Sequence, residues 1–164
     1  MKPTKKVVLN SAGLHIKQIS CFSSLEAASA QESNSNEQGH HQHEEGKSAK
    51  FHGSLETETL EITLDSMKPT GTSALKILFS GVIADQMKGF HYSRCEVKNL
   101  QLFYNYLTKC EPCDARRVFP CFDEPHLKAI FSLTLTVPRS KVVLANTVLF
   151  LFHYLTRHIT PIVP

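Results

Sequence analysis

The sequence contains no tryptophan, and aromatic residues make up only 9% of its 164 positions. Proteins that bind single-stranded nucleic acid stack bases on aromatic side chains and surround phosphates with cations. Here the formal net charge is only +3, and basic residues do not cluster beyond Lys2, Lys5 and Lys6. The composition therefore argues against nucleic acid as a partner.

A secretory signal is also missing, because polar residues interrupt positions 1–20 where an apolar h-region would lie. No Asn-x-Ser/Thr acceptor occurs, and the number of cysteines, five, is odd. These features predict free thiols in a reducing compartment, and we expect a cytoplasmic protein. The longest apolar run, Thr147–Leu155, is shorter than the roughly 20 residues of a membrane span, so no span is expected.

What is present is a series of short segments with strand character. A length of 164 residues, 41% apolar and 20% charged, fits one globular domain. Apolar residues recur in extended patterns that turn signals separate, and Ala129–Val137 alternates most regularly. The pattern predicts an all-β antiparallel β-sandwich with strands near 6–22, 57–65, 74–83, 90–97, 100–107 and 129–137.

Two segments fall outside this pattern. Residues 23–50 are rich in Ser, Gln, Asn, Glu, Gly and His, and a composition with so little to bury predicts a disordered loop inserted between strands. A helix start is offered only by Pro125–Lys128, with Asp123 as its N-cap. A further short strand is predicted at Val142–Leu144.

The run Glu111–Pro125 combines prolines, four acids and two arginines around a few apolar residues. Proline fixes φ and removes a donor, so the run predicts a shaped loop rather than a helix or strand. Its charges could suggest acid–base chemistry, but arginine–carboxylate pairs that pin the loop are the favoured interpretation. Phe119 and Phe122 are expected to anchor it, and Cys121 to be a small buried apolar residue.

This run resembles the signature that ends the N-terminal β-domain of M1-family zinc aminopeptidases, the group that includes puromycin-sensitive aminopeptidase and aminopeptidase N. Weaker similarity is found at Leu9–Ile16, Leu75–Gly81, Asp85–Phe90, Leu127–Phe131, Val137–Pro138 and Val142–Asn146. The resemblance implies a partial N-terminal domain at 6–146 that lacks the first strands, followed by a divergent apolar tail at 147–164. The residues of the implied structural loop are Glu111, Asp114, Arg116, Arg117, Phe119, Pro120, Cys121, Asp123, Glu124 and Pro125.

The resemblance implies a parent activity that removes N-terminal residues from peptides with zinc-activated water. The family holds zinc with His-Glu-x-x-His, in which both histidines share one helix face. His43–Lys47 begins this pattern but has Lys47 at the second histidine, and the family's Gly-x-Met-Glu-Asn motif is absent. No catalytic residue, metal ligand or cofactor is therefore expected in this chain.

One departure falls at the substrate-binding position. The family enters its signature with Thr-Gln-Phe-Glu, and its glutamine helps to bind the free α-amine of the substrate. Here the residues are Thr108–Glu111, with Lys109 at that position. An ammonium has three donors and no acceptor, so Lys109 would repel a protonated amine.

Two other groups of residues have alternative interpretations. The segment 40–45, with three histidines and two glutamates, is a solvated loop or a weak metal binder without a rigid frame. Cys110 and Cys113 form a Cys-x-x-Cys pair, which can be redox-active or bind zinc with a second pair. No second pair exists, so coincidence is the favoured interpretation of this motif.

Three hypotheses follow for the chain as a whole. The first is an N-terminal fragment of an M1-like aminopeptidase that forms one wall of the cleft for peptide substrates without cleaving them. The second is an interaction module whose open sheet edges pair with peptides, a second copy or an aminopeptidase catalytic domain. The third is a poorly folded product of a degenerate reading frame.

Overall fold

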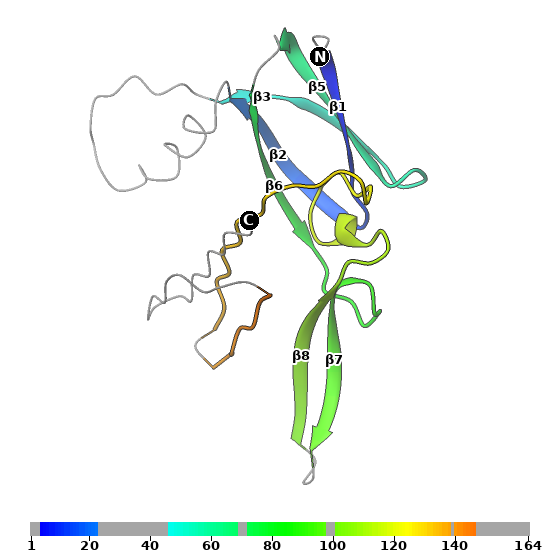
Figure 1. Cartoon of the computed structure of the whole chain (residues 1–164), viewed down its shortest axis with the longest axis vertical. Coiled ribbons are helices and arrows are strands. Elements are labelled where there is room, and N and C mark those ends of the chain that lie inside the picture. Colours follow the sequence, from blue (N-terminus) through cyan, green and yellow to red (C-terminus); the bar gives the residue numbers. More distant parts are fainter. Residues whose placement is uncertain (1–3, 23–45, 69–71, 98–100, 139, 147–164) are drawn as a thin grey trace, which may run out of the picture. The chain divides into compact units, whose positions relative to one another are not determined.

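The computed structural model describes residues 4–22, 46–68, 72–97, 101–138 and 140–146. Over these residues every regular element is a strand, apart from one short 3-10 helix (Figure 1). The prediction of an all-β antiparallel fold is confirmed. The elements are β1 Thr4–Asn10, β2 Leu14–Phe22, β3 Lys47–Ser48, β4 Lys50–Ser54, β5 Thr59–Lys68, β6 Ala74–Gly81, β7 Gly89–Val97, β8 Gln101–Lys109 and η1 Ala115–Arg117.

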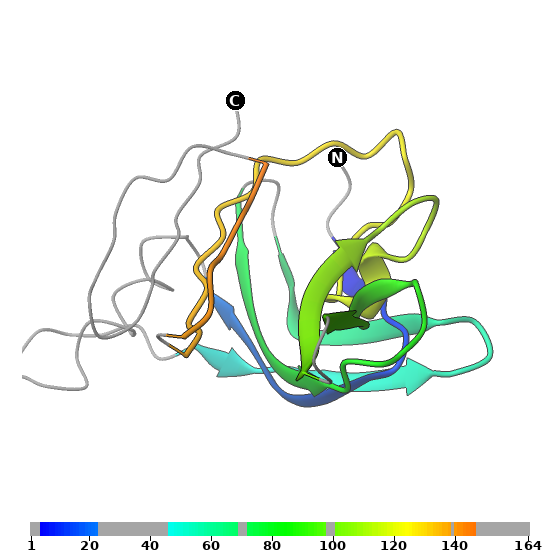
Figure 2. The ribbon, with the colours of Figure 1, turned by 90° about the horizontal axis from the view of Figure 1, so that it is seen from below.

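The chain divides into two compact units, Met1–Glu124 and Pro125–Pro164. All eight strands belong to the first unit and form three sheets with orders β1-β5-β4, β3-β2-β6 and β7-β8. β1 and β2 are consecutive in the sequence but lie in different sheets. Figure 2 shows the curved strands of the first unit from below. The turn between them includes Gly13, whose φ of 68° favours glycine because it has no Cβ.

The core joins the first two sheets. Leu60, Ile62 and Leu64 alternate on the buried face of β5 and are 1%, 0% and 7% exposed. They pack in one cluster with Leu9 of β1 and Ile19 of β2. The period-two pattern of the sequence therefore predicted the buried face of β5 correctly, because successive side chains of a strand point to opposite faces.

Aromatic contacts stabilise the β7–β8 hairpin. The ring centroids of Tyr92 and Tyr104 are 5.8 Å apart in an edge-on arrangement, and those of Phe90 and Tyr106 are 6.4 Å apart. The guanidinium of Arg94 lies 5.8 Å from the centroid of Tyr92. Cross-strand aromatic pairs contribute roughly 0.2–1 kcal/mol each, which helps a two-stranded sheet that would otherwise be marginal.

Three predictions for the second unit are wrong. Ala129–Val137 has the clearest alternation in the sequence, yet the structure forms no strand there, nor at Val142–Leu144. Pro125–Lys128 contains a turn instead of a helix start. Alternation defines a face, but a strand also needs a neighbouring strand for its backbone hydrogen bonds, and none of the three described sheets includes residues 129–137.

The remaining differences concern boundaries. Strand structure resumes at Lys47, earlier than the predicted loop end at residue 50, and β5 continues to Lys68. Most of the predicted loop, the turn near Lys98–Asn99 and the tail at 147–164 lie outside the described residues. Within the described ranges, no helix is long and apolar enough to cross a membrane.

Replacing Ile62 with alanine should lower the free energy of unfolding by about 2–5 kcal/mol, because it leaves a cavity in the centre of β5. Leu55→Ala is the matched control, since this side chain is 90% exposed and its removal should cost less than about 0.5 kcal/mol. Urea denaturation followed by circular dichroism measures both values. Equal effects of the two substitutions would contradict the assignment of the core.

Candidate functional site

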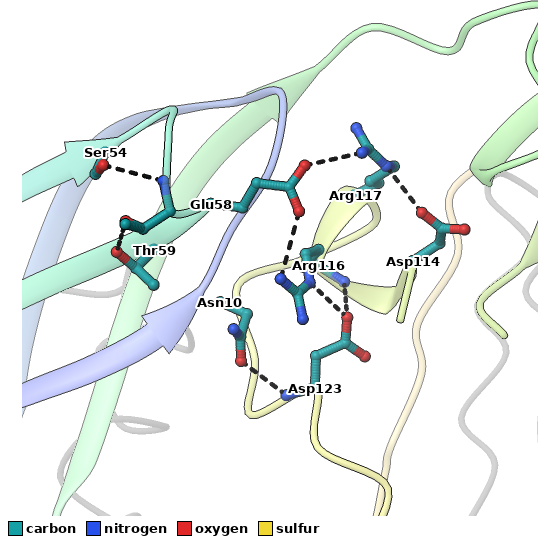
Figure 3. A network of polar contacts seen from close by, with 9 residues as sticks. Asn10, Ser54, Glu58, Thr59, Asp114, Arg116, Arg117 and Asp123 are labelled. Atoms are coloured by element: carbon teal, nitrogen blue, oxygen red, sulfur yellow. Dashed lines mark hydrogen bonds and ion pairs between the residues drawn. The ribbon is translucent and has the colours of Figure 1, made fainter. Parts of the chain in front are cut away.

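The run Glu111–Pro125 docks on the turn between β1 and β2. The backbones of Asn10 and Cys121 exchange two hydrogen bonds, with N to O distances of 2.7 and 3.1 Å. The amide of Ala12 donates to the carbonyl of Arg116 at 2.9 Å. The amide of Asp123 donates to the side-chain Oδ1 of Asn10 at 3.1 Å (Figure 3). The run is therefore held to the sheet domain through its backbone as well as its charges.

Arg116 lies at the centre of the polar network in Figure 3. Its Nε donates to Oδ2 of Asp123 at 2.9 Å, and its backbone N–H donates to the same oxygen at 3.2 Å. Both side chains are shielded from solvent, at 16% and 8% exposure. The hydrogen bond to Asp123 raises the pKa of the Arg116 guanidinium above its ordinary value. A pair this shielded holds the loop in one geometry.

Glu58 joins the two arginines to the β4–β5 turn. Its Oε1 accepts from Nη2 of Arg117 at 2.9 Å, and its Oε2 lies 3.3 Å from Nη1 of Arg116. Arg117 also donates from Nε to Oδ1 of Asp114 at 2.9 Å. Each arginine thus contacts two carboxylates, as the ion-pair interpretation of the loop predicts.

Sequence reasoning missed Glu58, which is far from the loop in the chain. Its φ of 51° is uncommon for a residue with a side chain, and its carbonyl accepts from the amide of Ser11 at 2.8 Å. A backbone held in this sparsely populated region requires support from its surroundings. The hydrogen bond and the two ion pairs supply that support, and no feature of the sequence marks position 58 for this role.

Gly89 brings the β7–β8 hairpin against the loop. Its φ is 58°, and a Cβ at this position would lie 2.6 Å from Cβ of Arg117 and 3.2 Å from the carbonyl oxygen of Asp114. Only glycine fits this close approach. Lys109, the predicted substrate-binding position, pairs with Gly89 at the end of β8 and is exposed. The repulsion of a protonated substrate amine by Lys109 stays a prediction.

The other predicted loop residues differ in their surroundings. Phe122 is 55% exposed, so the prediction that it anchors the loop is wrong, whereas Phe119 is partly buried. Cys121 is partly buried, and burial followed by the charge of Asp123 raises its pKa to about 11. Its thiol therefore stays protonated at neutral pH. Pro120 is also partly buried, while Glu111, Glu124 and Pro125 are exposed.

The chemistry available to this site is limited. The carboxylates of Glu58, Asp114 and Asp123 each form an ion pair with an arginine. Over the described ranges, no three His, Cys, Asp or Glu side chains gather as metal ligands. The residues that the structure describes therefore do not fit a zinc ion, and His43–Glu45 lie outside them. These ion pairs hold the loop Glu111–Pro125 in position.

Comparison with known proteins identifies the family of this β-domain. The family model of the peptidase M1 N-terminal domain matches residues 1–150. The chain belongs to this family.

Several aminopeptidases are similar to it in sequence. Aminopeptidase M1 of Arabidopsis thaliana is 45% identical over 91 residues, covering 56% of this chain and 10% of that protein. Aminopeptidase 2, mitochondrial, of Saccharomyces cerevisiae is 45% identical over 85 residues, covering 51% and 9%. Aminopeptidase N of Bos taurus is 38% identical over 93 residues, covering 56% and 10%. The chain spans about a tenth of the length of the curated relatives that it matches.

Replacing Glu58 with glutamine should lower the free energy of unfolding by about 1–3 kcal/mol, because both arginines lose a carboxylate partner while the side chain keeps its size. Glu56→Gln is the matched control, since Glu56 lies in the same turn and is exposed. Thermal denaturation should show a lower midpoint temperature for Glu58→Gln. For Glu56→Gln the free energy of unfolding should change by less than about 0.5 kcal/mol. A neutral effect at Glu58 would mean that the network does not hold the loop.

Proposed function

We propose that this chain acts as the non-catalytic N-terminal β-domain of an M1 zinc aminopeptidase and forms one wall of its substrate cleft. The observation that carries the proposal is the docked loop Glu111–Pro125, which combines the family's signature with a fixed geometry. Relatives that share this domain are named as aminopeptidases. In this proposal the substrates are peptides with a free N-terminus.

The division of roles follows from the side chains in the loop. Its carboxylates neutralise its arginines, so the loop presents a rigid surface rather than a proton donor or nucleophile. Zinc, which polarises a peptide carbonyl and activates water, would be held by residues other than these 164. In this proposal the chain contributes part of the cleft wall, and the end of β8 with Lys109 lies beside the cleft. The five free thiols of the described cysteines support a reducing compartment, and we propose the cytoplasm.

The isolated chain should not release amino acids from aminoacyl-nitroanilide substrates, with or without added zinc. Its contribution is measured in a hybrid in which residues 4–124 replace the equivalent part of the Arabidopsis relative. In the hybrid, Lys109→Gln should lower KM by roughly 10- to 100-fold, because the amide accepts a hydrogen bond from the α-ammonium that Lys109 repels. Lys88→Gln is the matched control, as this exposed lysine adjoins Gly89, the partner of Lys109.

Two results would overturn this proposal. Zinc-dependent, chelator-sensitive release of amino acids by the isolated chain would show that it is itself an aminopeptidase. A folded, active hybrid with the same KM for Lys109→Gln and Lys88→Gln would show that Lys109 does not face the substrate amine.

A second candidate function is that of an interaction module. Within the described residues, each outer strand of the two three-stranded sheets pairs with a single neighbouring strand, and the end of β1 also bridges from Asn10 to Cys121. On the outer strand β6, Leu78 is 55% exposed. An unpaired strand edge offers backbone donors and acceptors to another chain, so the occupant would be an extended peptide, a second copy or an aminopeptidase.

Light scattering with multi-angle detection tests the module. Self-association should appear as a mass that rises with concentration, and Leu78→Lys should reduce it at least about tenfold, since charged residues on an edge oppose pairing. Val82→Lys is the control, because this residue is 88% exposed and lies beyond the end of β6. A monomer at every concentration that also fails to bind an M1 aminopeptidase would contradict the module.

A further inference from the structure

Two cysteines lie in one tight turn at the start of the docked loop. Cys110 directly follows β8, and Cys113 comes three residues later. The turn is closed by the amide of Asp114, which donates to the carbonyl of Cys110 at 2.7 Å. The Cα of Cys113 lies two covalent bonds from the donor nitrogen, and the Cα of Cys110 lies two covalent bonds from the acceptor oxygen. This hydrogen bond therefore limits the separation of the two Cα atoms to roughly 6 Å, whatever the geometry of the residues between them. A disulfide spans Cα separations of about 4.4–6.8 Å, so the backbone already has a suitable spacing.

The two thiols have different surroundings. Cys113 is exposed, whereas Cys110 is partly buried. Burial, followed by the charges of Asp123 and Asp114, raises the pKa of the Cys110 thiol. An exposed sulfur is accessible to a small disulfide, and a partly buried neighbouring sulfur is suited to resolve the product.

We propose that Cys110 and Cys113 form a reversible redox site that reacts with small-molecule disulfides of the glutathione type. Neither the match to the peptidase M1 N-terminal domain nor the names of the relatives assign such a site. The proposal uses only the turn and its two sulfurs, so it stands whether or not the chain serves an aminopeptidase.

The exchange takes place in two steps. The thiolate of Cys113 attacks one sulfur of the small disulfide, a new S–S bond forms, and one small thiolate leaves. Cys110 then loses its proton to solvent and attacks the Cys113 sulfur, which releases the second small thiolate. Two electrons pass from the two protein sulfurs to the small disulfide, which becomes two thiols. An excess of a small thiol reverses both steps.

The disulfide would act directly on the loop. Asp114 follows Cys113, and its carboxylate accepts a hydrogen bond from Arg117 at 2.9 Å. In the reduced chain one backbone hydrogen bond, from the amide of Asp114 to the carbonyl of Cys110, closes the turn. A covalent link between Cys110 and Cys113 would keep the turn closed and Asp114 in place. Oxidation should therefore fix the end of the loop that adjoins β8.

Peptide mapping of the whole chain tests the proposal. The folded chain is incubated with oxidised glutathione, blocked with iodoacetamide and digested with trypsin, which cleaves after Lys109, Arg116 and Arg117. Both sulfurs then lie in the peptide Cys110–Arg116, and Cys121 lies in another. This peptide should be unalkylated and lighter by two hydrogen atoms than the reduced peptide. Dithiothreitol should restore both alkylation sites.

Two variants complete the test. Cys110→Ser should trap Cys113 as a mixed disulfide with glutathione, because no resolving thiol remains. Cys95→Ser is the matched control, since it removes an exposed cysteine of β7 and should leave the linked peptide unchanged. The ratio of linked to mixed disulfide should be at least about tenfold higher in the folded chain than in guanidinium, where the turn no longer aligns the sulfurs.

Three outcomes would overturn the proposal. In the first, Cys110 and Cys113 each keep a separate glutathione or remain open to alkylation. In the second, the bond joins either of them to Cys121, so that two tryptic peptides are linked. In the third, folding leaves the ratio of linked to mixed disulfide unchanged.

Discussion

The carboxylate of Glu58 is the contact on which the docked loop depends. It binds Arg116 and Arg117 together, at 3.3 and 2.9 Å, from a turn that precedes them by more than fifty residues. Two adjacent arginines repel each other and lose hydration when they are partly shielded, so they need several carboxylates in fixed positions. Glu58, Asp114 and Asp123 supply these carboxylates. Backbone hydrogen bonds between Asn10 and Cys121 align the loop.

This constraint explains how the most charged run of the sequence is held in one geometry. A carboxylate that takes part in acid–base catalysis must exchange protons with a substrate, whereas these carboxylates accept hydrogen bonds from arginine. In the proposed role as one wall of a substrate cleft, this rigidity would let the loop keep its shape. It also gives Cys110 and Cys113 a fixed turn in which to meet.

Much of the fold follows from local pattern. The alternation in β5, the paired runs of β7 and β8 and the break at Asn10–Gly13 all predict the observed strands, because each depends on a few neighbouring residues. Ala129–Val137 has the strongest alternation and forms no strand, since pairing depends on a distant neighbour that alternation does not specify. For the same reason, the exposure of Phe122 could not be inferred from its apolar character.

The sequence by itself determined the all-β class, the family signature and the pairing of the loop arginines with carboxylates, because residue type and spacing encode each of these. Only the tertiary structure decided which carboxylate joins Arg116 and Arg117. That carboxylate belongs to Glu58, a residue with an uncommon φ of 51°. It also decided that Gly89 must lack a side chain, since Arg117 occupies the space where a Cβ would lie. Both are contacts between segments far apart in the chain, whose separation becomes short only when the sheets have formed.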